Sequence, residues 1–349
     1  MLTPGAMFGD YRVVMRLGKG GMGEVWLLEI EARHQLFAVK ILDPGLVAKD
    51  REYRKRFVRE AEIAMVIRHP NLVRVYDVGE DPESGLCYIL MQYVGGGSLS
   101  DRIQREGRLS VDVALDVVAQ LADVLEVARI DGVVHRDLKP DNVLFDANGV
   151  PMLTDLGIAR RQFERDCKML TMSGIILGTP SYMAPEQMLD SHEVDCRADI
   201  YSLGIVLYEM LTGERPNAEE TTMQLLRRAA KGEQIPDIRL VLPELSEPVA
   251  ELVRRMCEAD VGRRLATPRA VAEAVEAIRA GRDPFAPAST VRTQLRWRRR
   301  WRLVLAVMAV AAVVLIAVDF VAWWRLLREV PAENEEPQED ELFYIPSEV

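Results

Sequence analysis

Residues 135–142 read HRDLKPDN, and this octet decides how the rest of the chain is interpreted. Moving a phosphoryl group onto a hydroxyl needs a carboxylate to orient the hydroxyl, a cation near the phosphate charge and oxygen ligands for Mg²⁺. The octet offers Asp137 as the carboxylate, Lys139 as the cation and Asn142 as a hard oxygen ligand. It therefore predicts phosphoryl transfer from ATP with Mg²⁺.

The octet also resembles the catalytic loop of protein kinases, and the lysine two residues after the candidate base resembles the serine/threonine-specific members. This resemblance implies an α+β, two-lobed fold, with a small antiparallel β-sheet lobe carrying one helix and a larger, mainly helical lobe. We expect a lead at 1–10 and a kinase domain at 11–279, divided into lobes at about 11–94 and 95–279. ATP and Mg²⁺ are the implied cofactors and proteins the implied substrates, and a homodimer through the kinase domain is left open.

A glycine-rich stretch, LGKGGMGEV at 17–25, follows an apolar run that predicts a strand. The pattern GxGxxGxV lets backbone amides approach phosphate oxygens closely. Dinucleotide-binding folds share GxGxxG, but there the glycines open a helix, whereas residues 24–28 here are strand-like. By resemblance, the phosphate-covering residues are Leu17, Gly18, Lys19, Gly20, Gly21, Met22, Gly23, Glu24 and Val25.

Two charged residues of the small lobe are expected to act together. Lys40 ends the apolar run FAVK, at a distance from the glycines that resembles the family's phosphate-binding lysine. Helical spacing of apolar residues predicts a helix at about 51–67. Within it, Glu60 best resembles the glutamate that pairs with this lysine. Glu62 is the competitor, and the FVREAE context, which resembles bacterial (Hanks-type) kinases, favours Glu60.

The apolar run CYILMQYV at 87–94 leads into a glycine-rich connection and resembles the hinge between kinase lobes. In that family, the base of ATP bonds to hinge backbone and lies between apolar side chains. The resemblance implies Met91 as gatekeeper and the backbone from Gln92 to Val94 as the hydrogen-bonding edge. The side chains expected around the base are Leu17, Val25, Ala38 and Leu144.

Asp155 ends the strand-like run VPMLTD and resembles the second Mg²⁺ ligand, although Leu156 stands where the family usually has phenylalanine. Leucine keeps an apolar anchor, so we expect function to survive. The segment from Gly157 to the APE at 184–186 has the length of an activation loop. We expect autophosphorylation at Thr171, with Ser173 second, and the arginines that resemble the phosphate clamp are Arg136 and Arg160.

Architectural residues of the family are also matched. Asp199 resembles the buried aspartate that holds the catalytic-loop backbone, and Arg264 resembles the partner of Glu186. Two rival functions are weighed. A nucleotide-binding pseudokinase scaffold predicts loss of Lys40, Asp137 or Asp155, and a small-molecule kinase of related fold predicts loss of the APE segment. Neither loss occurs.

Composition describes a globular protein, with 49% hydrophobic and 28% charged residues in 349. A net charge of −10 argues against nucleic-acid binding. The four scattered cysteines form no CxxC pair, which argues against a zinc site and fits a reducing compartment. The first residues do not resemble a secretory signal.

The last part of the chain predicts a membrane anchor. A basic linker is expected at 280–302, a transmembrane helix at 303–324 and a short acidic extracytoplasmic tail at 325–349. The span has 22 residues, roughly 33 Å as a helix, with tryptophans near both ends. Six arginines precede it and two follow, so we expect a single-pass protein of the cell membrane with the kinase domain in the cytoplasm. The side chain of Asp319 either reaches toward the far membrane interface or pairs with a partner helix.

Overall fold

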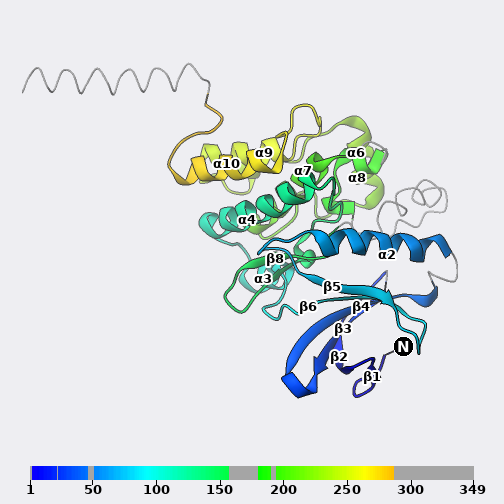
Figure 1. The fold of residues 1–349 in the computed structure, drawn as a ribbon. Coiled ribbons are helices and arrows are strands. Elements are labelled where there is room, and N and C mark those ends of the chain that lie inside the picture. The colour runs from blue at the N-terminus through cyan, green and yellow to red at the C-terminus, as the bar shows by residue number, and fades with distance from the viewer. Residues whose placement is uncertain (1, 22, 46–50, 157–179, 190–193, 287–349) are drawn as a thin grey trace, which may run out of the picture. The chain divides into compact units, whose positions relative to one another are not determined.

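The computed structural model describes residues 2–21, 23–45, 51–156, 180–189 and 194–286 (Figure 1). In the helix at 51–66, the side chains at 51–53, 56 and 60 are outside this description. All statements below about contacts and elements concern the described residues.

The smaller lobe is built on a six-stranded antiparallel sheet in the order β1-β2-β3-β4-β6-β5. Side chains alternate between its two faces, as the pleat requires. Along β4, Ala38 and Leu42 join the cluster on the helix side, while Phe37, Val39 and Ile41 join the cluster on the opposite face. The strands are β1 (Met7–Phe8), β2 (Tyr11–Gly20), β3 (Gly23–Ile30), β4 (Gln35–Leu42), β5 (Val75–Glu80) and β6 (Cys87–Gln92).

One long helix, α2 (Arg51–Val66), covers one face of this sheet (Figure 1). Its apolar positions Phe57, Ala61 and Ala64 are buried at helical spacing. They belong to the same cluster as Ala38 and Leu42 of β4 and apolar residues of β5 and β6. The helix predicted at about 51–67 is therefore confirmed.

The larger lobe is mainly helical and is centred on α7 (Cys196–Thr212), which is buried almost all round. A helix that is apolar on every side must lie inside a core, and the lobe's hydrophobic cluster surrounds it. One small hairpin lies at the lobe boundary. The other elements are α3 (Leu99–Glu106), α4 (Val111–Ile130), β7 (Val143–Phe145), β8 (Pro151–Leu153), α6 (Pro185–Leu189), α8 (Thr222–Lys231), α9 (Glu247–Met256) and α10 (Pro268–Arg279).

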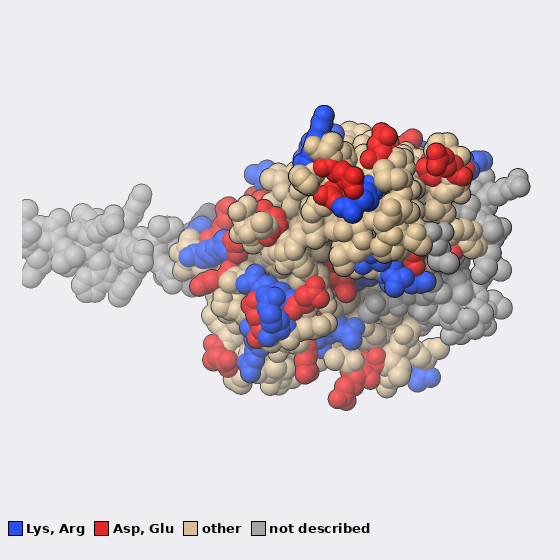
Figure 2. Space-filling model, turned by 90° about the horizontal axis from the view of Figure 1, so that it is seen from below, with Lys and Arg blue, Asp and Glu red and all other residues tan. Residues whose placement is uncertain are grey.

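The predicted two-lobed arrangement is thus confirmed. Acidic and basic side chains are interspersed over the face shown in Figure 2. No helix among the described residues is long and apolar enough to cross a membrane. The predicted span at 303–324 lies outside the described residues, as do the flanking segments from 287 onward.

Candidate active site

The carboxylate of Asp199, near the start of α7, binds the backbone of the first two residues of the HRD stretch. Its two carboxylate oxygens accept the backbone N–H groups of His135 and Arg136, each at 2.8 Å. Both amides can reach one carboxylate because Arg136 takes a left-handed conformation, with φ of 63°. Burial raises the pKa of Asp199, and the two backbone bonds and the neighbouring charges oppose that rise. The predicted role of Asp199 is confirmed.

His135 is fully buried and connects this stretch to the end of β8. Its Nδ1 accepts the Asp137 N–H at 3.2 Å, and its Nε2 lies 3.0 Å from the Thr154 carbonyl oxygen. A carbonyl only accepts and an amide N–H only donates, so the Thr154 contact uses a proton on Nε2 and the Asp137 contact uses the Nδ1 lone pair. His135 therefore fixes the positions of Asp137 and Thr154 relative to each other.

Three side chains of the octet, those of Asp137, Lys139 and Asn142, converge in space. The Lys139 Nζ lies 3.4 Å from the Asp137 Oδ2. From the other side, the Asn142 Nδ2 donates to the Asp137 backbone oxygen at 2.7 Å and lies 3.4 Å from its Oδ2. Because Asn142 uses its nitrogen in these bonds, its Oδ1 is the atom that remains to bind a cation.

Asp155 comes two residues after the end of β8 and also has a positive φ, 59°. Its Oδ1 forms an ion pair with the Lys40 Nζ at 2.7 Å, across 115 residues of sequence. Burial alone would raise the pKa of Asp155, but the charge and hydrogen bond of Lys40, together with His135 and Lys139, lower it below its ordinary value. Asp155 is therefore ionised at neutral pH.

The donor set at this place fits Mg²⁺. Asp155 offers a carboxylate and Asn142 an amide oxygen. The Thr154 N–H donates to the Asn142 carbonyl oxygen at 2.9 Å, which places the residue before Asp155 beside Asn142. No group of three or more His, Cys, Asp or Glu that could hold a metal occurs in the described part of the chain. Mg²⁺ is commonly held by one or two protein ligands, with phosphate oxygens and water completing its shell.

The glycine-rich stretch forms the hairpin between β2 and β3, with Gly20 opposite Gly23. Its strand context agrees with the exclusion of a dinucleotide fold. A Cβ added at Gly18 or Gly20 would meet no heavy atom within 4 Å, whereas one at Gly23 would lie 1.9 Å from the Ile41 carbonyl oxygen. Gly23 also has a φ of 148°. Of Gly18, Gly20 and Gly23, it is Gly23 that the packing of the hairpin requires.

Gly23→Ala should therefore lower the free energy of unfolding by about 1–3 kcal/mol, because the new methyl group clashes with backbone and alanine resists this φ. Nucleotide affinity should fall with it. Gly20→Ala is the matched control for stability, since its Cβ has open space. Urea denaturation of the two variants checks the prediction, and an equal loss in both would contradict it.

Three of the four apolar side chains predicted to surround the base of ATP belong to one cluster, which also includes the hinge residues Met91 and Val94. Ala38 and Met91 are buried in it, and Val25, Val94 and Leu144 pack against it half-buried. Leu17 is not part of this cluster and is 40% exposed. At the hinge, the backbone N–H of Gln92 donates to the Arg74 carbonyl oxygen at 2.8 Å, so this one group is already used.

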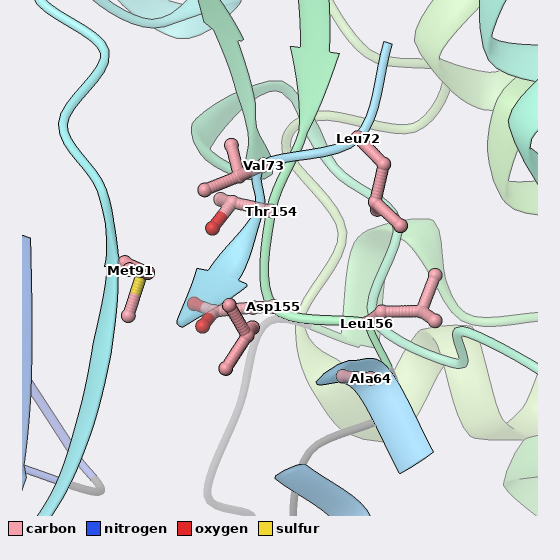
Figure 3. Close-up of a pocket in the computed structure, with 8 residues that line it drawn as sticks. Ala64, Leu72, Val73, Met91, Thr154, Asp155 and Leu156 are labelled. Atoms are coloured by element: carbon pink, nitrogen blue, oxygen red, sulfur yellow. The ribbon is translucent and has the colours of Figure 1, made fainter. Parts of the chain in front are cut away.

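A small cavity lies behind Met91 and reaches the start of the segment after β8 (Figure 3). Leu156, the residue that replaces the usual phenylalanine, is 4% exposed and packs in the core of the larger lobe. It anchors the chain directly after Asp155, as expected of an apolar residue there. The lining residues are Ala64, Leu72, Val73, Val75, Met91, Thr154, Asp155 and Leu156.

Several predicted residues lie outside the described part of the chain. These are Met22, Arg160, Thr171 and Ser173, together with the side chain of Glu60. The pairing of Lys40 with Glu60 therefore stays a prediction. Arg136 is described and 7% exposed.

Sequence reasoning gave no role to Gln187, which links the APE segment to the catalytic loop. Its Oε1 accepts the Ala184 N–H at 3.1 Å, and its Nε2 donates to the Arg136 carbonyl oxygen at 3.3 Å. The neighbouring residue Glu186 forms the predicted pair with Arg264, with N···O distances of 2.6 and 3.0 Å. No signal in the sequence marks a glutamine for such a contact, because its partners are backbone groups.

Comparison with known families settles the kind of domain. A model of the protein kinase domain matches residues 11–275. The chain belongs to the protein kinase family. This confirms the family implied by the octet and the glycine-rich stretch.

The chain is similar to serine/threonine-protein kinases of several bacteria. The chain is 37% identical over 288 residues to the PknA kinase of Corynebacterium glutamicum, covering 80% of this chain and 59% of that protein. It is 35% identical over 285 residues to PknA of Mycobacterium tuberculosis, covering 81% and 64%. The chain thus spans about three fifths of the length of these relatives. The crystal structure of the PknI kinase domain of M. tuberculosis matches with a TM-score of 0.62 and 29% identity, over 79% of this chain and 99% of that one.

Proposed function

We propose that the chain transfers the γ-phosphate of ATP to serine and threonine hydroxyls of proteins. The observation that carries the proposal is the convergence of Lys40, Asp137, Asn142 and Asp155 from segments far apart in the sequence. The similarity to serine/threonine-protein kinases supports the choice of acceptor.

Each residue then has a defined task. Asp137 orients the attacking hydroxyl and accepts its proton, while Lys139 and Lys40 place positive charge beside the phosphates. Asn142 and Asp155 would hold Mg²⁺, which neutralises the charge that develops on the phosphate oxygens. The rival interpretation, a nucleotide-binding pseudokinase scaffold, predicts that at least one of Lys40, Asp137 and Asp155 is replaced, and the sequence retains all three.

The proposal is tested by incubating the purified full chain with ATP labelled on the γ-phosphate, Mg²⁺ and a protein acceptor, followed by phosphosite mapping. We expect label on serine and threonine and none on tyrosine. Label that is equally strong after removal of Mg²⁺ by a chelator, or no label at all, would refute the proposed activity.

We further propose that the kinase is switched on by autophosphorylation at Thr171, with Ser173 second. Replacing both with alanine should lower the initial rate markedly, since a phosphate of roughly −1.5 to −2 charge would otherwise bind the arginine clamp. Wild type and the double variant are first treated with a phosphatase, and the initial rate of each is then measured before and after preincubation with ATP. A wild-type rate that is the same before and after preincubation would count against the switch.

Membrane anchoring is the third part of the proposal and rests on the sequence of 303–324. We propose a single-pass anchor with the kinase domain in the cytoplasm. Replacing two central apolar residues of the span with arginine should shift the chain from the membrane fraction to the soluble fraction. An unchanged distribution would reject the anchor. Dimerisation through the kinase domain stays a prediction.

A further inference from the structure

The strand that leads to Asp155 is held on both edges. One edge of β8 pairs with β7. On its other edge lies the segment 71–73, which joins α2 to β5 of the smaller lobe. The Leu153 N–H donates to the Asn71 carbonyl oxygen, and the Val73 N–H donates to the Leu153 carbonyl oxygen, each at 2.8 Å. Leu153 is only two residues before Asp155, so the position of segment 71–73 sets that of the carboxylate.

The Asn71 side chain fixes this segment in place. It is 7% exposed, and its Nδ2 donates to the Pro151 carbonyl oxygen at 2.8 Å and to the Gln120 Oε1 at 2.7 Å. Both hydrogens of the amide are therefore used. One bond holds the first residue of β8, and the other holds the middle of α4.

The contacts continue to the surface of the larger lobe. The Gln120 Nε2 donates to the Asp116 Oδ2 at 2.7 Å, and the Asp116 Oδ1 accepts from the Arg279 Nη2 at 3.0 Å. Arg279 is the last residue of α10. The four side chains form a continuous polar chain, here called the Asn71 chain, which consists of Asn71, Gln120, Asp116 and Arg279.

The orientation of both amides in this chain is determined by groups that only accept. The Asp116 carboxylate requires the nitrogen of Gln120, which turns the Gln120 oxygen toward Asn71. At the other end, the Pro151 carbonyl requires the nitrogen of Asn71. The two amide orientations are compatible, because the Gln120 oxygen faces the Asn71 nitrogen. Turning either amide over would therefore break two hydrogen bonds at once.

We propose that Asn71 is a positioning residue for Asp155, and that Gln120, Asp116 and Arg279 hold Asn71 in the orientation this needs. The proposal rests on the proposed kinase function, because it concerns the side chain expected to bind Mg²⁺. None of the four residues needs to touch nucleotide or substrate. They act through β8, whose end carries Asp155.

The expected effects of alanine substitution on Mg²⁺ binding decrease along the Asn71 chain, from Asn71 to Arg279. Substitution of a residue that orients a metal ligand typically lowers metal affinity 10- to 100-fold. Asn71→Ala should therefore raise the Mg²⁺ concentration for half-maximal nucleotide binding at least about tenfold. Arg279→Ala should raise it by no more than about fivefold, because a partly exposed ion pair contributes little.

The experiment measures binding of a non-hydrolysable ATP analogue to the full chain as Mg²⁺ is titrated, and again with EDTA present. We expect Asn71→Ala to weaken the Mg²⁺ response while its affinity in EDTA stays within about twofold of wild type. A residue with a merely structural role would lower the melting temperature and leave the Mg²⁺ midpoint unchanged, which would overturn the proposal.

A second pair of variants keeps the test decisive if Asn71→Ala does not fold. Gln120→Leu removes the acceptor for Asn71, whereas Asp116→Asn leaves that acceptor in place and keeps an amide oxygen for the Gln120 Nε2. We expect only the leucine variant to shift the Mg²⁺ midpoint, and equal shifts would overturn the proposal. Arg269→Ala is the matched control for Arg279→Ala, since Arg269 lies on the same helix and pairs with Glu273.

The two possible failures are distinguishable. If wild type binds no nucleotide in a Mg²⁺-dependent way, the proposed function is wrong. If wild type responds to Mg²⁺ and all variants of the Asn71 chain match it, only the positioning role is wrong. The double variant Asn71→Ala/Gln120→Leu should shift the midpoint no further than Asn71→Ala alone, because the two side chains act through one contact.

Discussion

Asp137→Asn is expected to lower kcat for phosphoryl transfer by roughly 10²–10⁴-fold, with the KM for ATP changed by less than about threefold. Asparagine matches aspartate in size, so it can still meet the Asn142 and Lys139 side chains that surround Asp137. It cannot accept the proton of the attacking hydroxyl. Initial rates at varied ATP concentration, with the same protein acceptor, separate the two parameters.

Asp141→Asn is the matched control for this prediction. Asp141 lies in the same loop but is exposed, and it belongs to the short helical turn Pro140–Asn142. Its kcat should stay close to that of wild type. A fall in the Asp141 variant as large as in the Asp137 variant would show that any lost charge in the loop impairs the enzyme, and would remove the case for a specific base.

Loss of Arg264 should have the largest effect on stability. Its side chain is 0% exposed and is bonded bidentately to Glu186. It also donates to the carbonyl oxygens of Arg197 and Glu258, at 2.6 to 3.0 Å. Arg264→Ala leaves the Glu186 carboxylate and these two carbonyls without their donors. The free energy of unfolding should fall by about 3–5 kcal/mol, measured by urea denaturation.

The neighbouring arginine provides a control with the same change of charge. Arg263 is 77% exposed and pairs only at 3.5 Å with Asp260, itself 62% exposed. Arg263→Ala should change the free energy of unfolding by less than about 0.5 kcal/mol. If the two alanine variants were equally stable, the buried network around Arg264 would not be a main support of the larger lobe.

The sequence predicts best those parts of the fold in which backbone conformation or burial within one element determines the residue types. The glycines of the β2–β3 hairpin and the apolar spacing of α2 follow from backbone conformation and burial, and each is where the pattern indicates. The octet at 135–142 is similarly compact, because Asp137, Lys139 and Asn142 contact one another within one loop.

Contacts between distant segments are less accessible to sequence reasoning. The bonds of Asn71 join residues 49 and 80 positions apart, and an asparagine in HPN is compatible with an ordinary turn. The ion pair between Lys40 and Asp155 joins residues 115 positions apart and is not predicted from the sequence. The pairing of Lys40 with Glu60 stays a prediction, because the Glu60 side chain lies outside the described residues.

The most direct test of the account is the Mg²⁺ dependence of ATP affinity in wild type and in Asp155→Asn. The account predicts that Mg²⁺ tightens ATP binding to wild type by at least about tenfold, and that this gain is lost in the variant while binding in EDTA persists. Mg²⁺ tightening ATP binding equally in both proteins, or in neither, would contradict the claim that Lys40, Asp137, Asn142 and Asp155 surround one magnesium nucleotide.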